Sequence, residues 1–414
     1  MPENHYAKRP AQGRIEPMNM SLFGRKRTVF HARSGARVFT LSERVIHDRV
    51  WHCVFYEWED LIGEWESVDT YLPEHSFQLS RRLYTLANYA THSTRLARVL
   101  SPHFDSCTLN QKYDLFFLIC ADIFELIAIN SIKNWRTKCR NAVCYLSECW
   151  TEEWLKGREF LLRPLKEFDH IFLGTRNSVD IVSKITGRPC SYLPLGVDMV
   201  KFAPNPAARG RTIDVWNLGR RSQVTHQALL EFAEQKQWLY YFDTVKNGNV
   251  PDAKEHRLLV SNLLKRCKYF IANHARADEA GVTRGHMELG MRYFEGAAAG
   301  TVMLGKPPAP EVFNEYFNWP DAIIPIPFDA PDIANTIADL EAQPVRLARI
   351  RRDNVVNSLL QHDWVYRWRR VLEAVDLEVT PQMLARESLL QDMAAKMTER
   401  QVDGRLAISG AVRG

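Results

Sequence analysis

The chain has 414 residues, and at about 150 residues per domain this length predicts two or three domains. Hydrophobic residues make up 46% of the sequence and charged residues 25%, which excludes wholesale disorder, a collagen and a small disulfide scaffold. The formal net charge of +5 suits an enzyme that handles anions but does not by itself indicate nucleic-acid binding. No window of about 18 uncharged apolar residues predicts a membrane-spanning helix.

The first 27 residues are polar and basic, and they contain no apolar stretch like that of a secretory signal. We expect a frayed, flexible arm. The more specific alternative is that this arm contacts an acidic membrane. The eight cysteines form no C-x-x-C pair, and several lie in apolar runs. We therefore expect reduced core cysteines in a cytoplasmic protein.

From residue 28, β-rich runs alternate with helical stretches, a pattern typical of an α/β fold with parallel sheets. The predicted strands of the first half are 50–56, 113–120, 141–148, 170–175 and 189–196. Between the last two lies a predicted helix over 177–187, with Asn177 as a candidate cap and Gly187 at its end. This spacing predicts a βαβ unit.

The segment 203–211, rich in proline and small residues, is the predicted linker, and the alternation then restarts. The predicted strands of the second half are 213–219, 239–245, 268–274, 301–305 and 322–328, with helices at 224–237, 253–267 and 290–300. A last helical run spans 346–375, and the polar tail 380–414 is expected to be mobile apart from a short helix around 381–399.

These elements predict two facing Rossmann-like domains, at 28–205 and 209–345, with the 346–375 helix packing back toward the first. In such folds ligands bind in the crevice beyond the carboxyl ends of the strands. The informative residues should therefore come just after strands.

Several motifs that mark cofactor, metal or nucleophile sites are missing from the sequence. The sequence contains no G-x-G-x-x-G, H-E-x-x-H or G-x-S-x-G pattern. GTVMLGKP at 300–307 approaches a P-loop, but Pro307 stands where a Ser or Thr should hold magnesium. No Asp-x-Asp occurs, so a diphosphate site built on a divalent metal is unsupported. We expect neither a resident cofactor nor a metal.

The most informative segment is 274–305, in which a loop rich in Arg, His and Gly follows a strand and feeds a helix. Free N–H groups at a helix start attract anions, Gly290 allows close approach, and Arg284 and Arg292 add forked donors. Glu295 lies three residues after Arg292, on the same helix face. These features predict a phosphate or diphosphate site; a solvated Arg292–Glu295 pair is the plainer alternative.

Four segments together resemble GT-B glycosyltransferases. They are LPLGVDMVKFAPN (193–205), NLGRRS (217–222), MRYFEGAAAGTVMLGK (291–306) and HDWVYRW (362–368). The sequence is most similar to the CgeB-type, spore-maturation-protein-like group, with its family-four-like C-terminal domain and R-x-F-E-x-x-A-x-G signature. The resemblance covers about 170–375 well and 28–170 only by general pattern.

The resemblance implies a donor site. Glu295 corresponds to the family's second spaced glutamate, which binds ribose hydroxyls, whereas Met287 occupies the place of the first and Glu288 is one step away. Arg220 corresponds to the arginine that faces the diphosphate. Arg220 and Arg292 are expected to act in catalysis, and the other expected donor-binding residues are Gly219, Arg221, Arg284, Glu288, Gly290, Tyr293 and Glu295.

In the first domain, Glu148 ends a predicted strand, where general bases are often placed, and it is the third catalytic candidate; an exposed loop carboxylate is the alternative. The segment 56–71 sets six carboxylates among aromatic residues. Sugars need such stacking faces and acceptors, although a plain acidic surface segment has the same composition.

The expected reaction is metal-independent transfer of a sugar from a nucleotide-diphosphate sugar to a carbohydrate, lipid-linked or small-molecule acceptor, with at most peripheral membrane contact and no nucleic acid. Arginines would stabilise the departing diphosphate. Two alternatives stay open. A nucleotide-sugar epimerase would share the architecture and need no acceptor, and a non-catalytic binding module would bind nucleotide without turnover.

Overall fold

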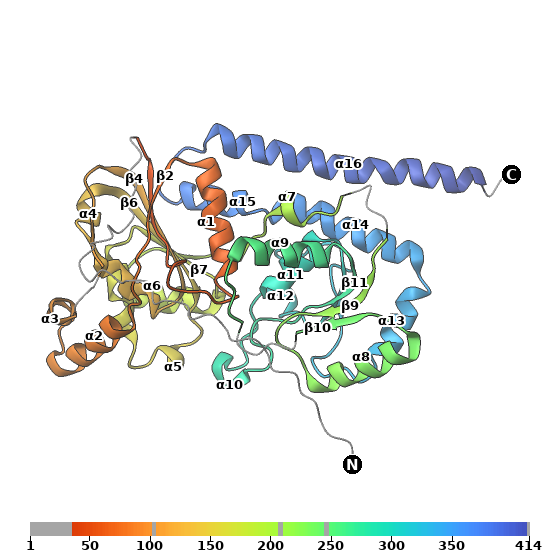
Figure 1. Ribbon diagram of the computed structural model, residues 1–414, viewed down its shortest axis with the longest axis horizontal. Coiled ribbons are helices and arrows are strands. Elements are labelled where there is room, and N and C mark those ends of the chain that lie inside the picture. The colour runs from red at the N-terminus through yellow and green to blue at the C-terminus, as the bar shows by residue number, and fades with distance from the viewer. Residues whose placement is uncertain (1–34, 102–104, 206–209, 244–247, 412–414) are drawn as a thin grey trace, which may run out of the picture.

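The computed structural model describes residues 35–101, 105–205, 210–243 and 248–411, and side chains through residue 399 except at 94, 95 and 98 (Figure 1). The arm predicted at 1–27 and four residues of the predicted linker, 206–209, lie outside these ranges. Two parallel sheets, each flanked by helices, form the two halves of the molecule. The α/β prediction with two Rossmann-like domains is confirmed.

The first sheet has the strand order β2-β1-β4-β6-β7-β8, and every pair in it is parallel. Its strands are β1 (Val38–Leu41), β2 (Val68–Tyr71), β4 (Tyr113–Asp122), β6 (Cys139–Glu148), β7 (His170–Leu173) and β8 (Cys190–Tyr192). β4 and β6 are buried along most of their length, as near-continuous apolar runs predict for a parallel sheet. A small separate pair joins β3 (Cys107–Thr108) to β5 (Ile132–Lys133).

The helices of the first domain are α1 (Cys53–Trp65), α2 (Gln78–Thr91), α3 (Thr94–Leu100), α4 (Trp135–Lys138), α5 (Glu152–Leu155), α6 (Val179–Thr186) and α7 (Met199–Phe202), with 3₁₀ turns η1 (Glu125–Ser131), η2 (Glu159–Glu167) and η3 (Arg176–Ser178). The predicted helix after β7 is confirmed as α6, and Gly187 ends it with φ 68°. That left-handed conformation favours glycine.

The predicted strand at 50–56 is wrong, because Cys53 begins α1 there. Buried Val54, Trp58, Ile62 and Trp65 recur at helical spacing, so the apolar run is the start of a helix whose face packs on the sheet. The strands β1 and β2, which the sequence analysis missed, are four residues each.

The second sheet has the order β10-β9-β11-β12-β13 and is also parallel. Its strands are β9 (Ile213–Asn217), β10 (Tyr240–Phe242), β11 (Cys267–Ile271), β12 (Val302–Gly305) and β13 (Ile324–Pro325), which confirms all five predicted strands. The helices are α8 (Gln223–Lys236), α9 (Ala253–Leu264), α10 (Ala280–Thr283), α11 (Met291–Ala298), α12 (Pro310–Phe313) and α13 (Ile333–Glu341).

The predicted run 346–375 is two helices, α14 (Pro344–Gln361) and α15 (Trp364–Glu373). The break has a local cause: the carboxylate of Asp363 accepts a hydrogen bond from the N–H of Val365 and caps α15. α15 packs on the first domain, where Trp364 stacks on Trp58 with ring centroids 4.7 Å apart. The predicted return to the first domain is thus confirmed.

The last helix, α16 (Pro381–Ala411), runs along the α14 and α1 side of the molecule, at the top of Figure 1. Its side chains Met383, Leu390 and Ala394 are buried in the core. The helix predicted around 381–399 is therefore confirmed, although it continues to Ala411, and its first turns bury an apolar stripe.

All eight cysteines lie within the described ranges, none of them forms a disulfide there, and seven are buried, as expected of core cysteines. No helix in the described ranges is long and apolar enough to cross a bilayer.

Candidate active site

The carboxyl ends of the two sheets meet between the domains. Glu148, the last residue of β6, pairs with Arg276 in the loop after β11, with 2.5 Å between Oε2 and Nη2. The backbone N–H and the side-chain amide of Asn177, which follow β7, donate to Glu288 at 3.3 Å. The residues predicted to face the crevice thus come from both edges.

At the end of β9, a turn presents the predicted Gly-Arg-Arg sequence. Gly219 has φ 86°, and its N–H donates to the carboxylate of Asp243 at 2.8 Å. The guanidinium of Arg221 donates to the carbonyl of Asp243 at 2.7 Å and lies over the ring of Phe242. Arg221 therefore holds the turn together.

Arg220 points away from that turn toward the loop after β11. Its Nη1 lies 2.7 Å from carboxylate oxygens of both Asp278 and Glu279, and its side chain is 44% exposed. Exposed ion pairs of this kind contribute little to stability and exchange easily. An anionic ligand could therefore displace the acidic pair from Arg220.

α11 begins at the same edge. Gly290 precedes it, and a Cβ at Gly290 would stand 3.0 Å from the carbonyl oxygen of Asn273, so the chain passes closely here. Arg292 lies in the first turn, with Nη2 only 3.8 Å from where a Cβ of Gly219 would be. The structure brings Arg292 and the Gly219 turn together.

Glu295 lies beneath Arg292 and is fully buried. One carboxylate oxygen pairs with Arg292 and the other with Arg257 of α9. Burial alone would raise the pKa of Glu295, but the guanidinium groups of Arg292 and Arg257 lower it below the ordinary value. Neither oxygen is free, so the expectation that Glu295 takes both ribose hydroxyls is not met in this structure.

The structure contradicts the prediction that Tyr293 contacts the donor. Its side chain is fully buried, its ring packs edge-on against Phe313, and its hydroxyl donates to the carbonyl of Lys306 at 2.7 Å. On an eight-residue helix, the position after Arg292 faces inward toward β12 and α12. Tyr293 therefore belongs to the core of the second domain and does not face a donor.

Glu288 is 2% exposed, and its Oε2 has no hydrogen-bond partner within the described ranges. Burial raises the pKa of this carboxyl to about 7, although the N–H of Asn177 opposes the shift. Arg284 sits in the same loop at φ 52°, is exposed, and forms no ion pair with any described residue. Both residues remain candidates for ligand contact.

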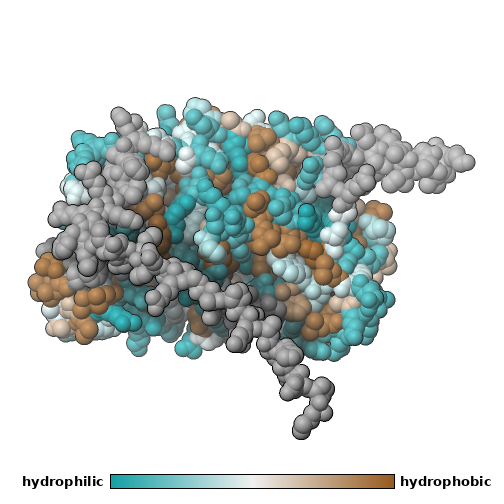
Figure 2. Space-filling model, in the orientation of Figure 1, coloured by the Kyte–Doolittle hydropathy of each residue, from teal (hydrophilic) through white to brown (hydrophobic). Residues whose placement is uncertain are grey.

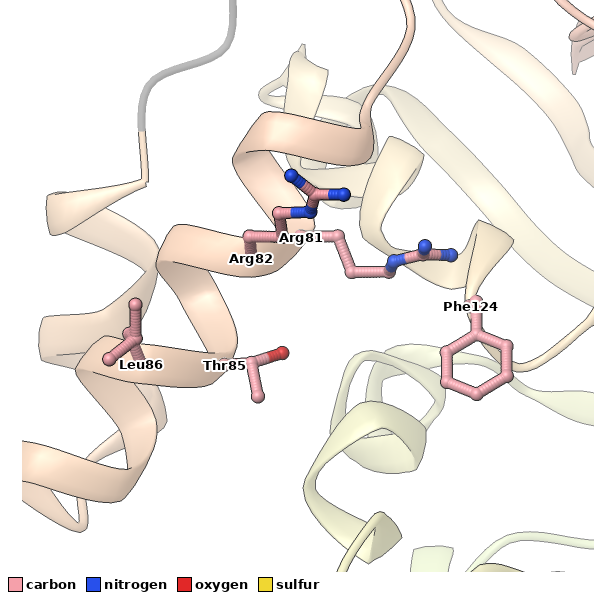
Figure 3. Close-up of a pocket in the computed structure, with 5 residues that line it drawn as sticks. All are labelled: Arg81, Arg82, Thr85, Leu86 and Phe124. Atoms are coloured by element: carbon pink, nitrogen blue, oxygen red, sulfur yellow. The ribbon is translucent and has the colours of Figure 1, made fainter.

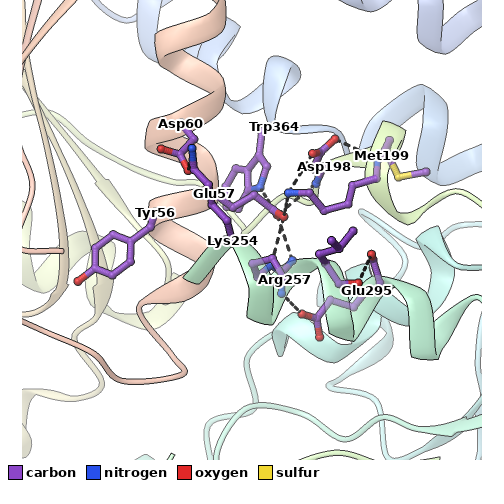
Figure 4. A network of polar contacts seen from close by, with 12 residues as sticks. Tyr56, Glu57, Asp60, Asp198, Met199, Lys254, Arg257, Glu295 and Trp364 are labelled. Carbon is purple, nitrogen blue, oxygen red and sulfur yellow. Dashed lines mark hydrogen bonds and ion pairs between the residues drawn. The ribbon is translucent and has the colours of Figure 1, made fainter. Parts of the chain in front are cut away.

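The segment 56–71 is neither a sugar platform nor an ordinary acidic surface. Glu57, on α1, lies 4% exposed between the domains, where Oε2 meets Arg257 at 3.0 Å and Oε1 meets Lys201 at 2.9 Å (Figure 4). Burial would raise the pKa of Glu57, but Arg257 and Lys201 lower it to about 2. The indole N–H of Trp364 also donates to Glu57 at 3.3 Å.

These contacts form a buried chain of charges, Glu57–Arg257–Glu295–Arg292, that runs from the first domain to the Gly219 turn. Sequence analysis missed Arg257 and the role of Glu57. In the sequence, nothing distinguishes Arg257 from the other polar residues of α9. Its partner Glu57 is 200 positions away in the sequence. No local pattern joins them.

Sequence analysis also missed an acidic cluster at the edge of the first sheet. His47 lies 2.7 Å from Glu43, which follows β1, and His52 lies 2.8 Å from Glu125, which follows β4. Ligand atoms of Glu43, His47 and Glu125 all lie within 4.8 Å of one another, so the group could hold a cation. Burial, followed by the charge of Glu125, raises the pKa of Asp122 to about 6.

Residues 223–373 match a family model described as glycosyl transferase-like. No curated protein matches the chain.

Among solved structures, the chain is similar to HepE of Anabaena in complex with UDP, at 11% identity and a TM-score of 0.48, over 82% of this chain and 99% of that one. It is also similar to TarM of S. aureus, at 11% identity and a TM-score of 0.37, over 63% and 55% of the two chains. A glycotransferase of kitacinnamycin gives 10% identity and a TM-score of 0.35, over 82% and 98%.

The family match falls on the domain that carries Arg292, and two facing parallel sheets with a returning C-terminal helix are the GT-B architecture. The fold is thus of the GT-B type, and its second domain carries a glycosyl transferase-like segment.

Proposed function

We propose that this protein transfers a sugar from a nucleotide-diphosphate sugar, bound at the carboxyl edge of the second sheet, to an acceptor at the edge of the first. The observation that carries the proposal is the position of Arg292. It lies in the first turn of α11, against the Gly219 turn, within the part of the chain that matches the glycosyl transferase-like model.

The chemistry of that position suits a leaving diphosphate. The start of α11 offers free N–H groups and a partial positive charge, and the forked guanidinium of Arg292 adds a fixed cation. Arg220 would join them when phosphate oxygens replace Asp278 and Glu279 as its partners. Preorganised donors of this kind stabilise charge that develops as the sugar leaves.

Glu295 acts in this scheme as a positioning residue. Its carboxylate holds Arg292 from below, and Arg257 holds Glu295 in turn. Ribose hydroxyls could reach Glu295 only if Arg292 released the Glu295 carboxylate oxygen with which it pairs. Glu288, with its unpaired buried oxygen between the domains, is the residue we propose for the donor sugar.

The first domain supplies the acceptor side. Asp122 and Glu148 are neighbours in the register of β4 and β6, and Glu43 and Glu125 follow strands at the same edge. Carboxylates orient acceptor hydroxyls and can take a proton from them. We propose Glu148 as the base, because its remaining oxygen is available when Arg276 occupies Oε2.

The test begins with thermal unfolding of the whole chain in UDP, GDP, ADP, CDP and dTDP. A diphosphate at 100 times its dissociation constant should stabilise the fold by about 2.7 kcal/mol. The matching nucleotide sugar is then incubated with candidate acceptors. Sugar transfer supports the proposal; isomerised donor without acceptor would identify an epimerase, and binding without turnover a binding module.

A further inference from the structure

The helices α2 and α3 pack against each other as a hairpin, residues 78–100, at the end of the first domain far from the second domain (Figure 1). One face of this hairpin is apolar and exposed. Its large exposed side chains are Leu79, Leu86, Tyr89, Leu96, Val99 and Leu100. Val99 is 82% exposed, the highest value of any large hydrophobic side chain in the described ranges.

The exposed residues follow helical spacing, which shows that they form a face. On α2, Leu79, Arg82, Leu86 and Tyr89 are separated by three, four and three positions, whereas Tyr84 on the opposite side is buried. Figure 2 shows hydrophobic residues gathered at this end of the molecule. Clustered exposed apolar side chains of this kind mark an interaction surface.

The charge of the hairpin indicates what the surface meets. Between Gln78 and Ser101 the sequence contains four arginines and no aspartate or glutamate. Apolar side chains interleaved with arginines are the composition of helices that lie in the interface of an anionic bilayer. A protein partner would more often be met by a mixture of charges, and this hairpin carries one sign only.

The α2 part of this exposed face also borders a cavity that leads toward the proposed acceptor edge. A cavity of about 390 Å³ is lined by Arg81, Arg82, Thr85, Leu86 and Phe124 (Figure 3). Arg81 extends from α2 over the ring of Phe124, at 5.1 Å from its centroid. Phe124 comes two residues after Asp122, which ends β4. A bilayer against Leu86 and Arg82 would therefore also meet this cavity.

We propose that the α2–α3 hairpin docks the protein on an anionic lipid surface, with Leu79, Leu86 and Val99 in the interface and Arg82 against the headgroups. This goes beyond the proposed transfer reaction and does not depend on it, since docking requires neither donor nor acceptor. The lipid surface would bring membrane-borne molecules to the first-domain side of the crevice.

The test is co-sedimentation of the full chain with vesicles of phosphatidylcholine, alone or with about 30% phosphatidylglycerol. The hairpin variant is Leu86→Gln with Arg82→Glu. The matched control is Leu239→Gln with Lys236→Glu, which removes one exposed leucine and reverses one exposed cation on the second domain. A third variant, Val99→Gln, tests α3 through a single exposed side chain.

Wild-type and control proteins should sediment with the anionic vesicles and stay in solution with phosphatidylcholine alone. The hairpin variant should partition at least about tenfold less, and Val99→Gln should show a smaller loss in the same direction. All four proteins should melt alike, because the changed side chains are exposed.

Three results would overturn the proposal. Wild-type protein could fail to bind anionic vesicles. The hairpin variant could bind as well as the control, which would assign binding to another part of the chain. Finally, wild-type protein could form a dimer in solution that the hairpin variant lacks, with no vesicle binding, which would make this face a contact between copies.

Discussion

Two of the contacts between the domains differ in character. In the inner contact, Glu57 and Arg257 are buried and Trp58 stacks on Trp364. In the outer contact, at the mouth of the crevice, the side chains of Glu148 and Arg276 are 38% and 28% exposed. Buried pairs are costly to break, whereas exposed pairs exchange easily with water or ligand. The inner contact therefore holds the domains, and the outer contact can yield to substrates.

Removing the cation of the inner contact should have the largest effect on stability. Arg257→Met leaves Glu57 and Glu295 buried without their shared partner, and we expect a loss of about 3–5 kcal/mol in the free energy of unfolding. Denaturant titration measures it. The control is Lys254→Met on the same helix, whose side chain is 73% exposed and lies 3.6 Å from Asp60.

The control should lose less than about 1 kcal/mol. Equal, small losses in the two variants would mean that the buried chain does not hold the domains together.

The roles of Glu148 and Arg276 in the outer contact can be separated by changing each residue in turn. If Glu148 takes a proton from the acceptor, Glu148→Gln should lower kcat by about 10²–10⁴. Arg276→Gln removes the same ion pair but keeps the carboxylate, and it should lower kcat less than about tenfold. Steady-state kinetics with the accepted donor decides the matter. Equal losses in both variants would mean that Glu148 acts only as the ion-pair partner of Arg276.

How far the sequence predicts this arrangement depends on the range of each interaction. The ending of α6 at Gly187 and the shared face of Arg292 and Glu295 are local, and both were predictable. Tyr293 was misjudged because a motif position does not tell which side of α11 faces α12.

The pairing of Glu57 with Arg257 depends on how the two domains meet, so no spacing in the chain reveals it. The strand predicted at 50–56 failed for a different reason. A short apolar run fits a strand and a buried helix equally well, and only its continuation to Trp65 distinguishes them.

The buried carboxyl of Glu288 should make the stability of the folded protein depend on pH. Burial raises its pKa to about 7 in the folded protein, above the ordinary 4.5 of a glutamate. The folded state therefore holds this proton more tightly than the unfolded state, and the contribution to stability is lost as pH rises from about 4.5 through 7. Its size is of the order of a few kcal/mol.

Glu288→Gln cannot ionise, so its melting temperature should fall less between pH 5 and pH 8 than that of the wild type. Differential scanning calorimetry at the two pH values measures the difference. Parallel curves would place the titrating group elsewhere.

The smallest expected effect is that of chelation. We propose that arginines, in place of a metal, stabilise the diphosphate, so donor binding and turnover should survive EDTA unchanged. The Glu43–His47–Glu125 group makes this a sharp test, because its ligand atoms lie close enough to share a cation. Activity that disappears in EDTA and returns with Mg²⁺ or Mn²⁺ would contradict metal independence.

The central claim is that Arg292 grips the donor diphosphate at the second-domain edge. Isothermal titration with the nucleoside diphosphate that stabilises the wild type most tests it directly, comparing Arg292→Lys with the control Arg346→Lys, whose guanidinium pairs with Asp321 far from the Gly219 turn. A charge-assisted hydrogen bond contributes about 1.5–3 kcal/mol, so Arg292→Lys should raise Kd about tenfold to a hundredfold while the control binds as the wild type does. Wild-type affinity in Arg292→Lys would contradict the account.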